Sequence, residues 1–192
     1  MTRSFRHAAL AALVALAPLS AAAAPATVGS PALAWQSMGT LSPAEGRTEN
    51  IGVAGLLQGT FGDYIIVGGG ANFPDGGPLT GGAKVTYPDV YVLHATEAGL
   101  IETDHAQMPY PVGYGVSVTT PDGVLYFGGS TDESGVRAVT RLTAPNGKLR
   151  TETRPALPFA LQNGVAAYDK DTVYLGGGKQ DGVLSKKFYT YD

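Results

Sequence analysis

The chain has 192 residues, with 13 lysines and arginines against 16 aspartates and glutamates, and a formal net charge of −3 at pH 7. This acidic balance lacks the basic excess of proteins that bind nucleic-acid phosphates, so no nucleic-acid partner is expected. The absence of cysteine excludes disulfides, thiolate metal sites and cysteine nucleophiles. The 27 glycines and 13 prolines favour short strands joined by turns over a helical bundle.

The first 24 residues have the pattern of a secretory signal peptide. Arg3 and Arg6 form a positive start, residues 8–19 are apolar, and residues 21–24 are the small alanines that a signal peptidase needs. The apolar stretch is shorter than the roughly 20 residues that span a bilayer. We therefore expect an exported protein, periplasmic or secreted, with no membrane attachment after cleavage.

The first folded unit is predicted from two apolar runs on either side of a turn. Residues 51–57 and 64–67 have β-rich composition, and Gly62-Asp63 between them predicts a hairpin. A glycine doublet then follows at residues 68–69, and a further β-rich run at residues 90–93. This order of strand, turn, strand, doublet and strand describes an antiparallel sheet.

Two further units repeat this order. Their strands are predicted at residues 114–118, 124–127 and 139–142, and at residues 164–168, 172–175 and 188–191. The spacing of roughly 50 to 60 residues is close to the ~50-residue period of kelch propellers. We predict an all-β fold, a kelch-type β-propeller with three blades of about four strands each. The blades are expected at about residues 35–93, 94–142 and 149–192.

Four short runs carry a family resemblance: GVAG at 52–55, GGGANFP at 68–74, KVTYPD at 84–89 and YGVS at 114–117. They resemble the kelch superfamily, and more closely its cyclically permuted mutarotase branch, which includes the N-acetylneuraminate epimerases. The resemblance covers about residues 35–192. It implies that the chain carries the last two blades of the epimerase arrangement followed by the first.

The resemblance also implies a ring of six blades, of which this chain supplies about three. An open stack of blades exposes strand edges that invite aggregation. We therefore expect an incomplete propeller, either a truncated reading frame or half of an assembly that a second chain or a second copy completes.

By resemblance, the expected function is a sugar mutarotase or epimerase that interconverts the anomers of a sialic-acid-like sugar without a cofactor or a metal. Two alternatives stay open: a non-catalytic kelch module that binds carbohydrate or protein, and an inactive fragment without the catalytic blade. The resembling epimerases have a glutamate directly after a glycine doublet and an arginine six residues on. Here Gly70, Ser130 and Gly178 follow the doublets, so the glutamate and arginine do not transfer.

The expected substrate-binding residues lie in two places. The long loop 70–88 supplies Asn72, Phe73, Lys84 and Tyr87, which together offer an amide, two rings and an ammonium to a sugar. Long loops in compact domains are often functional, although Asn72 can also serve turn chemistry alone. Tyr114 and Asn163 stand just before inner strands, where a side chain can point into the channel or pack between blades. They complete the predicted set, apart from Arg137.

Mutarotation needs one group that donates a proton to the ring oxygen and another that removes the anomeric hydroxyl proton. The candidate catalytic residue is Glu133, and Arg137 four residues later is the candidate ligand of a substrate carboxylate, because guanidinium matches carboxylate geometry. The alternative is a solvated surface pair that contributes less than about 1 kcal/mol.

Overall fold

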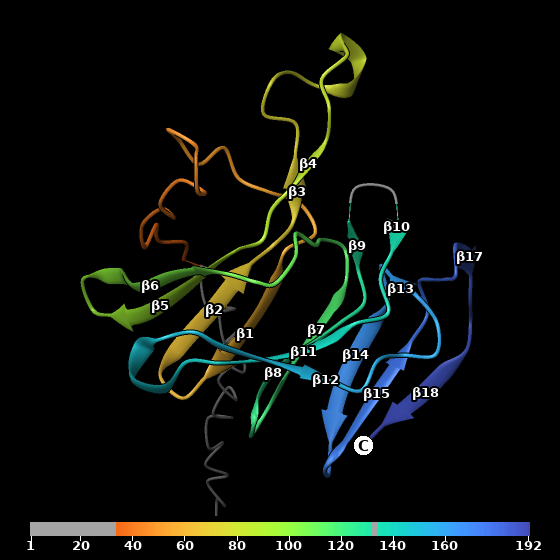
Figure 1. Ribbon diagram of the computed structural model, residues 1–192. Helices are drawn as coiled ribbons and strands as arrows, with labels where there is room; N and C mark the ends of the chain where they lie inside the picture. Colours follow the sequence, from red (N-terminus) through yellow and green to blue (C-terminus); the bar gives the residue numbers. More distant parts are fainter. Residues whose placement is uncertain (1–33, 132–133) are drawn as a thin grey trace, which may run out of the picture. The chain divides into compact units, whose positions relative to one another are not determined.

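The computed structural model describes residues 34–131 and 134–192 (Figure 1). The predicted signal peptide, residues 1–24, and the candidate Glu133 lie outside the described residues. Residues 36–192 form one unit. In the described part of the chain, no helix has both the length and the apolar character needed to cross a membrane.

Three main antiparallel sheets, each of which we call a blade, make up most of this unit. The first blade has the strand order β1-β2-β5-β6, formed by β1 (Leu57–Phe61), β2 (Tyr64–Gly68), β5 (Asp89–Thr96) and β6 (Gly99–Gln107). The second has the order β7-β8-β11-β12, formed by β7 (Val116–Thr120), β8 (Gly123–Phe127), β11 (Val139–Thr143) and β12 (Arg150–Arg154). The third consists of β14 (Val165–Asp169), β15 (Thr172–Gly176) and β18 (Phe188–Tyr191).

Small strands pair with one another after the glycine doublets. They are β3 (Ala71–Asn72) with β4 (Val85–Thr86), β9 (Ser130–Thr131) with β10 (Ser134–Gly135), and β13 (Leu161–Gln162) with β16 (Lys179–Gln180) and β17 (Val183–Leu184). The exception is β13, which precedes the third blade and pairs with β16. Two short 3₁₀ turns, η1 (Pro78–Thr80) and η2 (Pro145–Gly147), lie between strands.

The core lies between the faces of successive blades. Side chains alternate between the two faces of a strand, so Leu57 and Ile66 of the first blade pack against Tyr126 of the second. On its other face the second blade packs Phe127 against Leu175 of the third blade. The inner strands β1, β7 and β14 lie side by side in that order (Figure 1). The predicted all-β fold, a partial β-propeller, is confirmed.

The blade limits differ from the expected ones at the outer strands. Residues 94–107 were expected in the second blade, but they end β5 and form β6, which pairs with β5 in the first blade. Likewise β12 closes the second blade instead of opening the third. Neither outer strand contains a buried residue, so both lack the apolar alternation by which buried strands are recognised in sequence.

The glycine doublets form the junctions between blades. Gly69 has a φ of 61°, and a Cβ there would lie 2.5 Å from the carbonyl oxygen of Val112. The N–H of Gly70 donates to that carbonyl at 2.9 Å, and the N–H of Gly129 donates to Leu161 O at 2.7 Å. The first two doublets therefore allow the backbone to approach the segment that leads into the next blade.

Candidate functional site

Three residues in left-handed conformation mark the entry to the inner strands. They are Gly55, Tyr114 and Asn163, with φ of 67°, 60° and 52°. The N–H of Tyr114 donates to Gly55 O at 2.7 Å, and the N–H of Asn163 donates to Tyr114 O at 2.8 Å. Left-handed conformation costs a non-glycine residue about 1–3 kcal/mol and is concentrated at functional sites. We call these three residues, together with Lys84, the channel mouth.

Lys84 lies over Tyr114 in the channel mouth. Its Nζ is 5.5 Å from the centre of the Tyr114 ring, a distance at which the ring attracts the cation. Lys84 directly precedes β4 in the long loop after the first doublet. The loop therefore brings an ammonium group to Tyr114, and Asn163 is joined to Tyr114 through the backbone alone.

Asn72 and Tyr87 form a second group. The Tyr87 hydroxyl donates to Asn72 Oδ1 at 2.8 Å, and Asn72 Nδ2 donates to Gly52 O at 2.7 Å. These bonds tie the base of the long loop to the segment before β1. Both side chains also line a cavity of about 400 Å³ against the first blade.

The remaining candidates lie elsewhere. Arg137 donates from Nη1 to Pro158 O at 2.9 Å and from Nη2 to the Asp181 carboxylate at 3.0 Å. Its guanidinium thus connects the second and third blades. Phe73 is half-buried beside Asn72 and is not among the residues that line the cavity.

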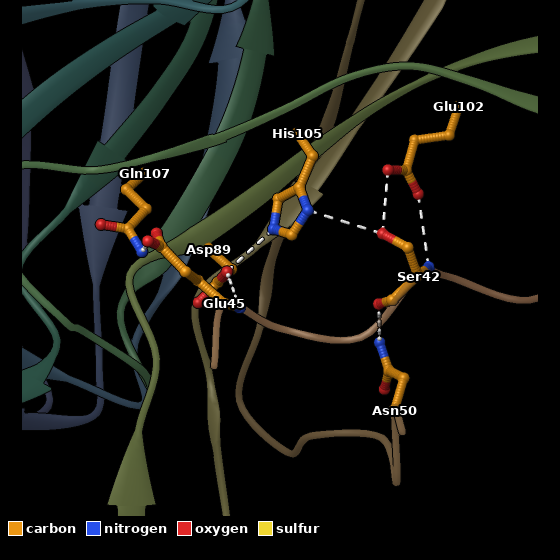
Figure 2. Close-up of polar contacts among 7 residues, drawn as sticks. All are labelled: Ser42, Glu45, Asn50, Asp89, Glu102, His105 and Gln107. Atoms are coloured by element: carbon orange, nitrogen blue, oxygen red, sulfur yellow. Dashed lines mark hydrogen bonds and ion pairs between the residues drawn. The ribbon is translucent and has the colours of Figure 1, made fainter. Parts of the chain in front are cut away.

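A polar network against the first blade was not expected from the sequence. His105 Nε2 lies 2.8 Å from Asp89 Oδ1, and His105 Nδ1 lies 3.5 Å from Ser42 Oγ (Figure 2). Ser42 Oγ donates to Glu102 at 2.9 Å, and the backbone N–H of Glu45 donates to Asp89 Oδ1 at 2.8 Å. The network holds the segment before β1 against strands β5 and β6.

The network departs from the repeat. In each blade, the N–H of the first glycine after the second strand donates to a backbone carbonyl. That carbonyl belongs to Asp89 in the first blade, to Ala138 in the second and to Lys187 in the third. A carboxylate at this position is therefore not required to build a blade. In the sequence, the presence of a carboxylate at this position in one repeat alone is the signal that could have indicated the network. In the described part of the chain, no cluster of three or more His, Asp or Glu side chains is arranged to hold a metal ion.

Comparison with known proteins gives relatives named N-acetylneuraminate epimerase. The chain is 35% identical over 130 residues to an N-acetylneuraminate epimerase of Yersinia pestis, which covers 62% of this chain and 32% of the relative. It is 31% identical over 138 residues to an N-acetylneuraminate epimerase of Pasteurella multocida, covering 65% and 35%. The resemblance predicted from the sequence is confirmed. The chain spans about a third of the length of these N-acetylneuraminate epimerases.

A solved structure, that of YjhT, supports the fold. It superposes with a TM-score of 0.55 at 18% identity and covers 71% of this chain and 42% of YjhT. No family model matches the chain. The similarity to N-acetylneuraminate epimerases thus rests on sequence, and the similarity to YjhT on the arrangement of the strands.

Proposed function

We propose that this chain takes part in the interconversion of the anomers of a sialic-acid-like sugar, and that the sugar binds at the channel mouth. The observation that carries the proposal is the 35% identity to N-acetylneuraminate epimerase over 62% of the chain. The substrate in that name is a sugar acid. A binding site for it needs a positively charged group for the carboxylate, close to groups that can contact the hydroxylated ring.

The channel mouth offers these groups. The Lys84 ammonium can bind a sugar carboxylate, and the Tyr114 ring beside it can contact the sugar. Glu133, which follows β9 in the sequence, remains the proposed proton-transfer group. Arg137 is not needed for carboxylate binding in this scheme, because Pro158 and Asp181 already accept its hydrogen bonds.

The second candidate function is sugar binding without catalysis. It is favoured by the short match, because the chain matches only 32% of the length of the Yersinia pestis epimerase. Residues needed for proton transfer in the longer protein then belong to the part that this chain does not match.

One pair of NMR measurements separates the two candidates. Saturation-transfer difference measures binding of N-acetylneuraminic acid, and exchange spectroscopy measures the rate of anomer interconversion. Binding with acceleration supports the mutarotase, and binding without acceleration supports the binding module. Lys84→Ala should weaken binding roughly tenfold, since hydrogen bonds to charged groups contribute about 1.5–3 kcal/mol.

Lys186→Ala, which removes an exposed ammonium of the third blade, is the matched control and should leave binding unchanged. Equal loss in both variants would contradict the channel-mouth site. Absence of binding by the wild-type chain would contradict both candidate functions.

We also propose export and a further partner. Export rests on the leader pattern of residues 1–24, and N-terminal sequencing of the mature protein tests it by locating the cleavage near Ala24. A further sheet, from a second chain or copy, is proposed to cover the exposed apolar face of the third blade. Light scattering tests it, because a purely monomeric chain with no tendency to associate would contradict a second copy.

A further inference from the structure

The cavity against the first blade is separate from the channel mouth. Residues 41–53, which we call the strap, cross the face of the first blade that points away from the second. The strap contributes Leu41, Asn50 and Ile51 to the cavity wall, and the blade contributes Val67 and Tyr91. The volume of about 400 Å³ lies in the range of small-molecule sites.

Tyr91 offers an unused hydrogen-bonding group to this cavity. Its side chain is 5% exposed and belongs to the cavity wall, and its ring stacks on His105 at a centroid distance of 4.4 Å. Within residues 34–131 and 134–192, its hydroxyl has no hydrogen-bond partner. Burial, helped by the charges of Asp89 and Glu102, raises the pKa of Tyr91 to about 12, so the hydroxyl keeps its proton at neutral pH.

Asp89 offers the complementary group. It is 3% exposed and also lines the cavity. Its Oδ1 accepts hydrogen bonds from the N–H of Glu45 and from His105. Its second oxygen, Oδ2, has no partner in the described part of the chain. Both side chains are almost fully buried, but these two oxygens are not enclosed by protein. They remain accessible from the cavity that their residues line, so a ligand there can supply the missing hydrogen-bond partners.

The charges of the wall restrict the ligand. Three carboxylates, those of Glu49, Asp75 and Asp89, line the cavity together with one guanidinium, that of Arg47. The excess of negative charge on the wall disfavours binding of an acidic ligand. The apolar wall residues suit the carbon face of a ring, while amides such as Asn50 suit hydroxyls.

We propose that the cavity under the strap binds a neutral polyhydroxylated molecule, a sugar or cyclic polyol, through Asp89 and Tyr91. A ligand hydroxyl donates to Asp89 Oδ2, and the Tyr91 hydroxyl donates to a ligand oxygen. This site is independent of the proposed function, which places an acidic sugar at the channel mouth.

Saturation-transfer difference NMR with the full chain tests the site. The probes are methyl α-D-glucopyranoside, methyl β-D-galactopyranoside and myo-inositol, with N-acetylneuraminic acid as the acidic comparison. At least one neutral probe should bind saturably, and Tyr91→Phe should weaken that binding roughly three- to tenfold, the effect of one neutral hydrogen bond. Lys84→Ala should leave it unchanged, which separates this site from the channel mouth.

Tyr174→Phe is the matched control, because Tyr174 is an exposed tyrosine of the third blade. It should bind the neutral probe as the wild type does. The proposal is overturned if none of the three neutral probes binds, which would indicate a cavity filled by water. It is equally overturned if Tyr91→Phe, with an unchanged unfolding transition, binds the probe as tightly as Tyr174→Phe does.

Discussion

The first and third blades have the same strand pattern but different burial. Val165, Tyr174 and Phe188 of the third blade occupy the positions of Leu57, Ile66 and Val90 of the first, as the strand pairing fixes. The first-blade residues are buried, whereas those of the third blade are 57%, 44% and 67% exposed. The corresponding second-blade residues, Val116, Leu125 and Val139, are buried too. The sequence pattern is sufficient to form the sheet of a blade, but burial of its apolar face requires a neighbouring sheet.

The outer faces of the stack differ as well. The first blade is covered on its other face by the strap, which the polar network of Figure 2 holds in place. The exposed face of the third blade carries three large apolar side chains on adjacent paired strands, and exposed apolar faces mark interaction sites. One face of the stack is thus closed by the chain itself, and the other is open.

The largest expected effect comes from replacing a large side chain by alanine at equivalent positions of the first and third blades. Ile66→Ala removes a fully buried side chain and should lower the free energy of unfolding by about 2–5 kcal/mol. Tyr174→Ala, at the equivalent position, should lower it by less than about 1 kcal/mol, because surface substitutions have small effects. Urea unfolding of both variants measures the difference. Equal losses would contradict the open face.

A smaller effect is expected at the contact between the first two blades. Asp104 of β6 accepts hydrogen bonds from Leu149 N–H at 2.8 Å and from the Lys148 ammonium at 3.0 Å. Burial alone would raise the pKa of Asp104, but these two bonds outweigh it and lower the pKa. The carboxylate therefore stabilises the fold above the ordinary carboxyl pKa, and this contribution is lost as the pH falls through the lowered value.

Asp104→Asn should therefore destabilise the chain by about 1–2 kcal/mol at pH 7. The difference from the wild type should shrink below a pH of about 4, where Asp104 begins to be protonated in the unfolded chain while the folded chain still keeps the carboxylate charged. Thermal unfolding from pH 7 to pH 3 measures this. Glu97→Gln, in the exposed turn between β5 and β6, is the control. A difference that stays constant down to pH 3 would refute the role of the charge.

The smallest effect is expected at the strap. Ser42→Ala removes the hydroxyl that donates to Glu102 and should change global stability by less than about 1 kcal/mol, because the contact is exposed. Locally, amide hydrogen exchange should accelerate at Leu100, whose N–H donates to Met38 O at 2.8 Å. An unchanged exchange rate at Leu100 would mean that Ser42 does not hold the chain just before the strap, at Met38, against β6.

Sequence predicts the regular parts of the fold because glycine doublets and apolar runs recur at fixed spacing. It places Tyr114 and Asn163 correctly before inner strands, since both precede a recognisable apolar run. The outer strands β6 and β12 escape prediction because exposed strands carry no apolar period. The network of Ser42, Asp89 and His105 escapes it because these residues lie far apart in the chain.

The most direct test of the difference between the blades is amide hydrogen exchange in their second strands. β2, β8 and β15 are each paired with a strand on both sides, so hydrogen bonding alone would protect them equally. With one face of the third blade open, β15 should exchange roughly tenfold faster than β2 and β8 in the monomeric chain. Equal protection of all three strands in the monomer would contradict the open face.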